Sequence, residues 1–199
     1  QKEESFEIKK DTGIGTNPGG SIANSPFYYK ATIGGTYYEA ISKAEPTGPT
    51  DYWPGIGMGG QEEVSFSSDM TPMTNPTPLG FTTIEITKDL LTNYYAATNA
   101  TVKEFLAPGS YPYKSTAQHG ISIIWGDKDG NLWSTLYGTA DQTGSTFKIV
   151  AAEEYYDDPS IKYSLKVKMQ FNCKLYKEDT GEMKELTNGE MVGLFGRIK

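Results

Sequence analysis

The sequence predicts an all-β fold: an antiparallel β-sandwich or barrel-like sheet of about nine to ten strands, with one short helix. Three observations predict it: a long alternating stretch near the C-terminus, a hairpin with a glycine turn, and the composition. The 199 residues include 22 Gly, 11 Pro and 14 Tyr, which is typical of many turns between strands and of a substantial core. We expect residues 1–25 to form a linker or edge strand and residues 26–199 to form a single β-sandwich domain.

The strongest signal runs from Ile161 to Leu175, where apolar and polar residues alternate without a break. A period of two over this length describes one strand of roughly 50 Å, because each residue adds about 3.3 Å. Such a strand must bend or bulge, and its apolar side needs a covering layer. We expect its polar side, which carries Lys162, Lys166, Lys168 and Lys174, to be a solvated face or a charged guard on a sheet edge.

A hairpin is predicted over residues 27–41. Gly34-Gly35 provide the positive φ angles that a two-residue hairpin turn requires. This turn fixes the register, because each residue of one strand then faces a defined residue of the other. The predicted pairs are Ala31 with Tyr38, Tyr29 with Ala40, and Lys30 with Glu39, the last a pair of opposite charges.

The middle of the chain is less regular. We expect a long irregular loop over residues 43–62, a short strand over 64–66, a Pro-rich loop through Pro72, Pro76 and Pro78, and a strand over 81–86. Residues 89–97 are a candidate helical piece. Thr101 begins a capping-box pattern that leads into Val102, Phe105 and Leu106 on one helical face, and Pro108-Gly109 end this helix.

The C-terminal half is predicted to form strands and turns. A hairpin is expected from residues 121–125 and 132–137, with Gly130 in its turn, and a strand from 146–152 with Phe147, Ile149 and Ala151 inward. The latter should pair with the long strand, placing Phe147 opposite Phe171 and Ile149 opposite Met169. Turns are expected at 157–160, 179–181 and 188–189, before a last strand with Val192, Leu194 and Phe195.

Five segments together carry a resemblance: "SPFYYKATIGGTYYEA", "VKEFLAPGSYPY", "GISIIWGDKDGNLWST", "GSTFKIV" and "FNCKLYKEDTGEMKELTNGEMVGLF". Their order resembles small extracytoplasmic lipoproteins of Bacteroidetes-type bacteria, in families of unknown function. The resemblance covers roughly residues 26–196. It implies an all-β sandwich, a lipid-bearing cysteine just before the mature chain, and no established enzyme activity. It therefore implies a binding or accessory module in the periplasm or on the outer surface of a Gram-negative cell.

Composition excludes some classes of function. The formal charge of −7 and the pI near 4.8 argue against a nucleic-acid partner, which would require a basic face. No apolar run reaches the roughly 18 residues that a membrane span needs. Membrane attachment would therefore depend on an N-terminal lipid anchor that this chain does not contain. The start at Gln1, with no initiator Met, is typical of a mature or truncated chain whose targeting segment is absent.

Few residues offer catalytic chemistry. His119 and Cys173 are single in the chain, which leaves no zinc ligand set, and His119 with Ser115 lacks the G-x-S-x-G elbow of a hydrolase triad. Cys173 lies on the apolar side of the long strand and should be a buried thiol. The acidic run over residues 153–158 could supply a metal site or a glycosidase carboxylate pair, and solvated hairpin-tip residues are the alternative.

Two groups of residues are candidate ligand sites. Tyr52 and Trp53, framed by Gly and Pro, could stack on a sugar ring or anchor a protein, and the alternative is that Trp53 folds back to plug the sandwich. Asp127, Asp129 and Asn131 resemble the start of a calcium loop, but the Glu that closes such a loop is missing, and a plain hairpin turn is the alternative. No other cofactor is expected.

The sequence thus favours a non-enzymatic cell-envelope binding module for a glycan or an envelope protein. Two alternatives remain at this stage. A carboxylate-dependent glycoside hydrolase needs neither His nor Cys, and would show two facing carboxylates in a cleft. A structural envelope subunit would show an exposed sheet edge that is open to strand addition.

Overall fold

The computed structural model describes residues 21–43, 51–59, 63–72, 82–92, 98–115, 119–155 and 161–198. In these ranges the chain forms β1 (Tyr28–Ile33), β2 (Thr36–Ile41), β3 (Tyr52–Gly59), β4 (Glu63–Pro72), β5 (Thr83–Thr92), α1 (Asn99–Phe105), β6 (Gly109–Ser110), β7 (Ile121–Gly126), β8 (Leu132–Ser134), β9 (Thr146–Glu154), β10 (Ile161–Lys177) and β11 (Met183–Ile198). Most of the predicted N-terminal linker, most of the Pro-rich loop and the turn predicted at 157–160 lie outside the described residues.

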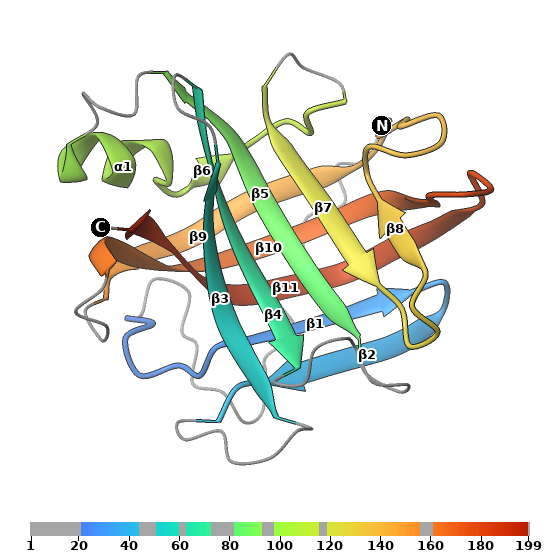
Figure 1. The fold of residues 1–199 in the computed structure, drawn as a ribbon, viewed down its shortest axis with the longest axis horizontal. Helices are drawn as coiled ribbons and strands as arrows, with labels where there is room; N and C mark the ends of the chain where they lie inside the picture. The colour runs from blue at the N-terminus through green and yellow to red at the C-terminus, as the bar shows by residue number, and fades with distance from the viewer. Residues whose placement is uncertain are drawn as a thin grey trace, which may run out of the picture.

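The strands form one sheet that folds over itself into two layers. Its order is β2-β1-β11-β10-β8-β7-β5-β4-β3, with β9 added on β10 and β6 on β9. Figure 1 shows β3, β4, β5 and β7 as a front layer that crosses a rear layer of β10, β11, β1 and β2. The short β8 pairs with both β7 and β10, and a single bridge between Ser42 and Tyr52 joins the two ends of the order. The predicted all-β, sandwich or barrel-like fold with one short helix is confirmed.

The two layers approach closely where β4 crosses β11. A Cβ atom on Gly193 would lie 2.4 Å from the Ser68 hydroxyl oxygen, so only glycine fits there. The space lets the Ser68 hydroxyl accept a hydrogen bond of 2.8 Å from the Leu194 backbone amide. Ser68 is fully buried, and this bond satisfies a polar group that would otherwise be costly in the core.

The long predicted strand is β10, and its apolar side is confirmed as core. The alternate residues Tyr163, Leu165, Val167, Met169, Phe171, Cys173 and Leu175 are all buried. The strand pairs with β11 along nearly its whole length and with β9 on its other edge, and register shifts interrupt both ladders as expected for a strand this long.

The expectation that the polar side of β10 is solvated holds at its start, where Lys162 is exposed, and is wrong in the middle of the strand. Lys166 and Lys168 are only 3% and 5% exposed. The segment before β1 lies over Lys166, whose Nζ donates hydrogen bonds to the carbonyl oxygens of Ala23 and Ser25 and lies 4.8 Å from the ring centroid of Phe27. The sequence pattern identified the two sides of the strand, but nothing local revealed that both sides are covered.

A second polar cluster on this side surrounds Glu190 of β11. Its carboxylate accepts hydrogen bonds from the Tyr28 hydroxyl at 2.6 Å and from the Gln170 amide at 3.0 Å. The ammonium groups of Lys30 and Lys168 each lie 3.5 Å from a Glu190 oxygen. Burial alone would raise the pKa of Glu190, but these hydrogen bonds and charges together lower it below its ordinary value. β1, β10 and β11 are thereby tied together by one buried carboxylate.

Several local predictions are confirmed. The β1–β2 hairpin has the predicted register, with Lys30 opposite Glu39, and Gly34 and Gly35 have φ angles of 55° and 81°. The β7–β8 hairpin turns at Gly130, whose φ is 82°. In the β9–β10 ladder, the predicted pairs of Phe147 with Phe171 and Ile149 with Met169 are present.

Two predictions fail at bulges. Ala151 was expected inward, but the β9–β10 register shifts after Ile149, so that Ala152 packs against the core instead. The turn expected at Asn188-Gly189 is a bulge within the continuous strand β11, where Asn188 has a φ of 52° and the ladders to β1 and β10 both shift. Turn-forming residues thus mark a bulge here, because strand β11 continues on both sides of them.

The helix is confirmed, but its start was misplaced. Thr98 is the N-cap, and its hydroxyl pairs with Thr101 at the third helical position, so Thr101 does not begin the helix. Val102 and Leu106 are fully buried and Phe105 packs against the core, as the helical spacing predicted. The predicted helical piece over residues 89–97 is wrong where it is described, since residues 89–92 belong to β5.

The largest error concerns the expected loop over residues 43–62. Residues 52–59 form the eight-residue strand β3, which pairs in register with β4 from Tyr52–Pro72 to Gly59–Ser65. β4 is also longer than the three residues predicted, and it ends at Pro72. The Gly and Pro residues that suggested a loop are tolerated because β3 lies at the end of the sheet order.

Candidate functional site

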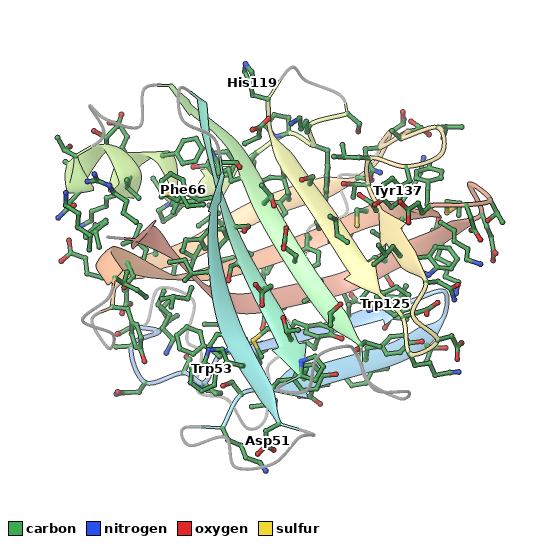
Figure 2. The ribbon with its side chains drawn as sticks, in the orientation of Figure 1. Asp51, Trp53, Phe66, His119, Trp125 and Tyr137 are labelled. Atoms are coloured by element: carbon green, nitrogen blue, oxygen red, sulfur yellow. The ribbon has the colours of Figure 1, made fainter. Side chains whose placement is uncertain are left out.

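Tyr52 and Trp53, the predicted ligand-binding pair, point to opposite sides of β3. Tyr52 packs against the core, and its hydroxyl accepts a 3.0 Å hydrogen bond from the Thr82 backbone amide. Trp53 points outward with 53% of its surface exposed, so it does not plug the sandwich. Figure 2 shows Trp53 beside the lower part of β3. Because successive residues of a strand point to opposite sides, Trp53 is available to a ligand on the outer side of β3 and Tyr52 is not.

Trp53 shares its side of the front layer with a set of hydroxyl and carboxylate side chains. Alternate residues of β4 and β5 point inward, among them Phe66, Met70, Ile84 and Ile86, which are buried. The intervening residues point outward. We call the outward set the hydroxyl face: Trp53, Ser65, Ser67, Asp69, Thr71, Thr83, Glu85 and Thr87.

Three glycines explain the shape of this face beside Trp53. Gly55, Gly57 and Gly59 alternate along β3 on the side of Trp53. Added Cβ atoms at Gly55 and Gly57 would lie 2.3 and 2.1 Å from side-chain oxygens of Asp69 and Ser67, their partners on β4. The polar side chains of β4 therefore lean over a strand that has no side chains of its own at these positions. The result is a low polar surface with one indole at its margin.

Asp69 and Glu85 are direct partners across the β4–β5 pair. Burial raises the pKa of both carboxyl groups, and the Asp69 charge raises that of Glu85 further. Hydrogen bonds from the Thr71 hydroxyl to Asp69 at 2.6 Å and from the Thr87 hydroxyl to Glu85 at 3.3 Å offset part of this rise. No cation among the described residues contributes to either pKa. The pair is therefore a set of hydrogen-bond acceptors whose pKa values are raised by burial and, for Glu85, by the neighbouring Asp69 charge.

Sequence reasoning missed Asp69 and Glu85. The first fell between a short strand and a Pro-rich loop, and the second was one residue of a strand candidate. The signal that could have found them is the alternation in residues 65–70 and 83–87, which places both carboxylates outward. Their direct pairing, however, depends on the β4–β5 register, and that register contains a shift.

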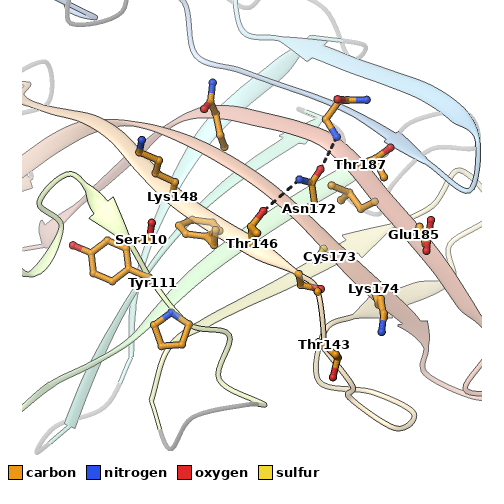
Figure 3. Close-up of a pocket in the computed structure, with 17 residues that line it drawn as sticks. Ser110, Tyr111, Thr143, Thr146, Lys148, Asn172, Cys173, Lys174, Glu185 and Thr187 are labelled. Atoms are coloured by element: carbon orange, nitrogen blue, oxygen red, sulfur yellow. Dashed lines mark hydrogen bonds between the residues drawn. The ribbon is translucent and has the colours of Figure 1, made fainter. Parts of the chain in front are cut away.

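A large open groove of about 1500 Å³ lies on the rear layer, along β9, β10 and β11. Figure 3 shows Asn172 at its centre, where its amide bonds the Thr146 hydroxyl at 3.3 Å and accepts from the Asn188 backbone at 2.9 Å. Lys174 is paired with Asp141 at 2.7 Å. Cys173 is 4% exposed, and burial raises its pKa to about 12, so its thiol is no nucleophile. Polar groups at the centre of the groove are thus already engaged with one another.

The Asp127 turn is held by its own hydrogen bonds. The Asp127 carboxylate accepts from the backbone amides of Asp129 and Asn131, from the Asn131 side chain and from the Trp133 indole, each at 2.9–3.0 Å. Burial would raise the pKa of Asp127, but these four donors lower it. They also occupy oxygens that a calcium ion would need, while Asp129 pairs with Lys128. The described ranges contain no group of three His, Cys, Asp or Glu residues that could hold a metal.

The remaining candidates have structural partners. Nδ1 of His119 lies 3.9 Å from Asp89, which Lys114 contacts at 2.7 Å, and His119 bonds to no serine in the described part of the chain. In the acidic run, Glu153 accepts hydrogen bonds of 2.8 Å from Ser21 and from the Ile22 amide. Glu153 therefore anchors the segment before β1 and is not part of a solvated tip, whereas Glu154 is exposed, as expected. Residues 156–158 lie outside the described residues.

A comparison of the chain with protein-family models, curated proteins and solved structures finds no match. Among the described residues, no helix is long and apolar enough to cross a membrane. Function must therefore be argued from the hydroxyl face and its surroundings.

Proposed function

We propose that the hydroxyl face binds a neutral glycan, with Trp53 as the stacking platform and Asp69 and Glu85 as acceptors for sugar hydroxyls. One observation carries this proposal: an indole that is 53% exposed borders a low sheet face of hydroxyls and carboxylates. The C–H side of a sugar ring packs on an aromatic face, while its hydroxyls need polar partners in fixed positions. Hydrogen bonds to charged acceptors are the stronger kind.

The placement of the two carboxylates favours binding over catalysis. A glycosidase places its two carboxyl groups on either side of the scissile bond, about 5 or about 6.5–9.5 Å apart. Asp69 and Glu85 instead stand side by side on one sheet surface as cross-strand partners. Their raised pKa values keep the hydrolase as a second candidate, since one of the two could hold a proton. Release of new reducing ends that is lost in Glu85→Gln would favour that candidate.

The cell-envelope setting belongs to the same proposal. Support comes from the resemblance to extracytoplasmic lipoproteins, in which a lipid anchor would hold such a module at the periplasmic or outer surface. A glycan of the envelope or of the surroundings would then be the ligand, and an envelope protein is the alternative partner.

The test uses the different exposure of the three tryptophans. Trp125 and Trp133 are 1% and 2% exposed, so acrylamide should quench Trp53 selectively. We expect a glycan from a broad neutral panel to shift the emission saturably and to protect Trp53 from the quencher. Trp53→Ala and Asp69→Asn should each weaken binding by about tenfold or more, measured by calorimetry.

Tyr37→Ala is the matched control, because Tyr37 is an aromatic residue on β2 with 59% exposure. It should leave binding unchanged. Absence of saturable binding across the panel, or full binding by Trp53→Ala, would overturn the proposal.

A further inference from the structure

Lys88 is a buried lysine that lies away from the hydroxyl face, and its amine contacts aromatic rings. Lys88 follows Ile84 and Ile86 on the inward side of β5, and only 7% of its surface is exposed. Its neighbours across the sheet are Phe66 on β4 and Ile121 on β7. The side chain therefore enters the core at the end covered by α1.

Aromatic rings take the place of counter-ions around this amine. Lys88 Nζ lies 3.6 Å from the ring centroid of Phe105 on α1 and 4.3 Å from that of Tyr111. Within the described residues it forms no ion pair and no hydrogen bond. Phe105 and Tyr111 are each only partly buried, so the amine lies just beneath the surface.

Lys166 and Lys168 are also buried, but they differ from Lys88 in this respect. Lys166 donates hydrogen bonds to two carbonyl oxygens, and Lys168 pairs with the Glu190 carboxylate at 3.5 Å. Among the described residues, the partners of the Lys88 amine are ring faces and no charged group, and burial lowers its pKa to about 8. This leaves roughly a tenth of the amine neutral at pH 7, against about one in 2,500 for an ordinary lysine. The neutral amine is the nucleophile.

We propose that Lys88 is a Schiff-base-forming amine and that Phe105 and Tyr111 form a binding site for planar, conjugated aldehydes. The Lys88 nitrogen lone pair adds to the aldehyde carbon, and a proton moves from nitrogen to oxygen to give a carbinolamine. Loss of water then forms the C=N bond. The two rings stack on the planar aldehyde, and they stabilise the protonated imine as they stabilise the ammonium group.

Salicylaldehyde, a planar aromatic aldehyde, is the probe. The protein is treated at pH 7 with a limiting amount of it and with sodium cyanoborohydride, which donates a hydride to the imine and fixes it as a secondary amine. Peptide mass spectrometry then gives the rate at each lysine. We expect Lys88 to react about tenfold or more faster than the exposed Lys43, Lys103 and Lys128. Equal or slower reaction at Lys88 overturns the proposal.

A second aldehyde separates amine reactivity from the aromatic site. Formaldehyde with the same reductant should also methylate Lys88 preferentially, because it needs no stacking surface. Tyr111→Leu should lower the ratio of salicylaldehyde to formaldehyde modification at Lys88 several-fold, while Tyr37→Leu should leave it unchanged. Preferential methylation without preferential salicylaldehyde labelling, or an unchanged ratio in Tyr111→Leu, would show that the rings form no aldehyde site.

Discussion

Glu190→Gln is the sharpest test of the buried polar cluster on the rear layer. The substitution keeps the size of the side chain but removes the charge that two hydrogen bonds and two ammonium groups share. Glu190 is 8% exposed and Lys168 is 5% exposed, so solvent compensates little for the lost charge. Lys168 loses its carboxylate partner, while the more exposed Lys30 can turn toward water.

The magnitude follows from these contacts. A hydrogen bond to a charged acceptor contributes about 1.5–3 kcal/mol and a neutral one about 0.5–1.5, so the two bonds together lose about 2 kcal/mol. Removing one partner of a fully buried ion pair costs about 3–5 kcal/mol, and glutamine retains part of the bonding. We therefore expect Glu190→Gln to lower the free energy of unfolding by about 3 kcal/mol at pH 7, a large share of the 5–15 kcal/mol typical of domains.

The loss should also depend on pH. The pKa of Glu190 is lower in the folded protein than in the unfolded chain, where it is about 4.3. The charged carboxylate therefore stabilises the fold above that unfolded value, and this contribution disappears as the pH falls through the folded value. The difference between wild type and Glu190→Gln should be full at pH 7 and should shrink below about pH 4.3.

Urea unfolding followed by circular dichroism at pH 7, 5, 4 and 3 measures this difference. Asp179→Asn is the matched control. The Asp179 side chain, which forms an ion pair with Lys177, is 67% exposed, so its removal should change the free energy of unfolding by no more than about 0.5 kcal/mol. A cost below about 1 kcal/mol at pH 7, or a cost that does not change with pH, would refute the reasoning.

Three further predictions concern other parts of the fold. Gly189→Ala would place a Cβ atom 2.5 Å from the ring of Phe171 and should lower the free energy of unfolding by about 3 kcal/mol or more. Gly35→Ala is the control: its Cβ atom has open space, only its φ of 81° is unfavourable, and the loss should be about 1–2 kcal/mol. Similar melting temperatures for the two variants would contradict this prediction. Val167→Lys places a charge at a fully buried core position and should cost several kcal/mol in urea unfolding; a change within about 0.5 kcal/mol would exclude this core assignment. The pKa of Lys88 is about 8 in the folded protein and about 10.4 in the unfolded chain. The free energy of unfolding of wild type should therefore rise relative to that of Lys88→Met as the pH increases between these two values. If the two proteins differ by the same free energy at pH 7 and pH 10, the pKa of this amine is not shifted.

The local sequence pattern predicted those strands whose partner is close in the chain, and those in which apolar and polar residues alternate over many positions. The β1–β2 register followed from the Gly34-Gly35 turn, because a two-residue turn leaves one alignment of the strands. The pairing of Phe147 with Phe171 followed from keeping two apolar faces together. The core side of β10 followed from its alternation alone.

The prediction from glycine-rich sequence was wrong where a distant strand gives the glycines another role. Residues 52–59 contain Gly and Pro at positions that suggested a loop, yet β4 pairs with them throughout. Gly55 and Gly57 provide space for the side chains of Asp69 and Ser67. Glycine is needed at these two positions only because β3 pairs with β4, and the sequence of β3 alone does not contain that information.

By itself, the sequence determined the class of fold, the two sides of β10 and the hairpins, because alternation and turn chemistry act over a few residues. Only the tertiary structure decided that Lys166 and Lys168 are buried, since a strand pattern cannot say whether a second layer covers its polar side. It also decided that Trp53, Asp69 and Glu85 share one face and that the Lys88 amine contacts two rings. Each of these placements depends on strand order and register across residues far apart in the chain, which no local window contains.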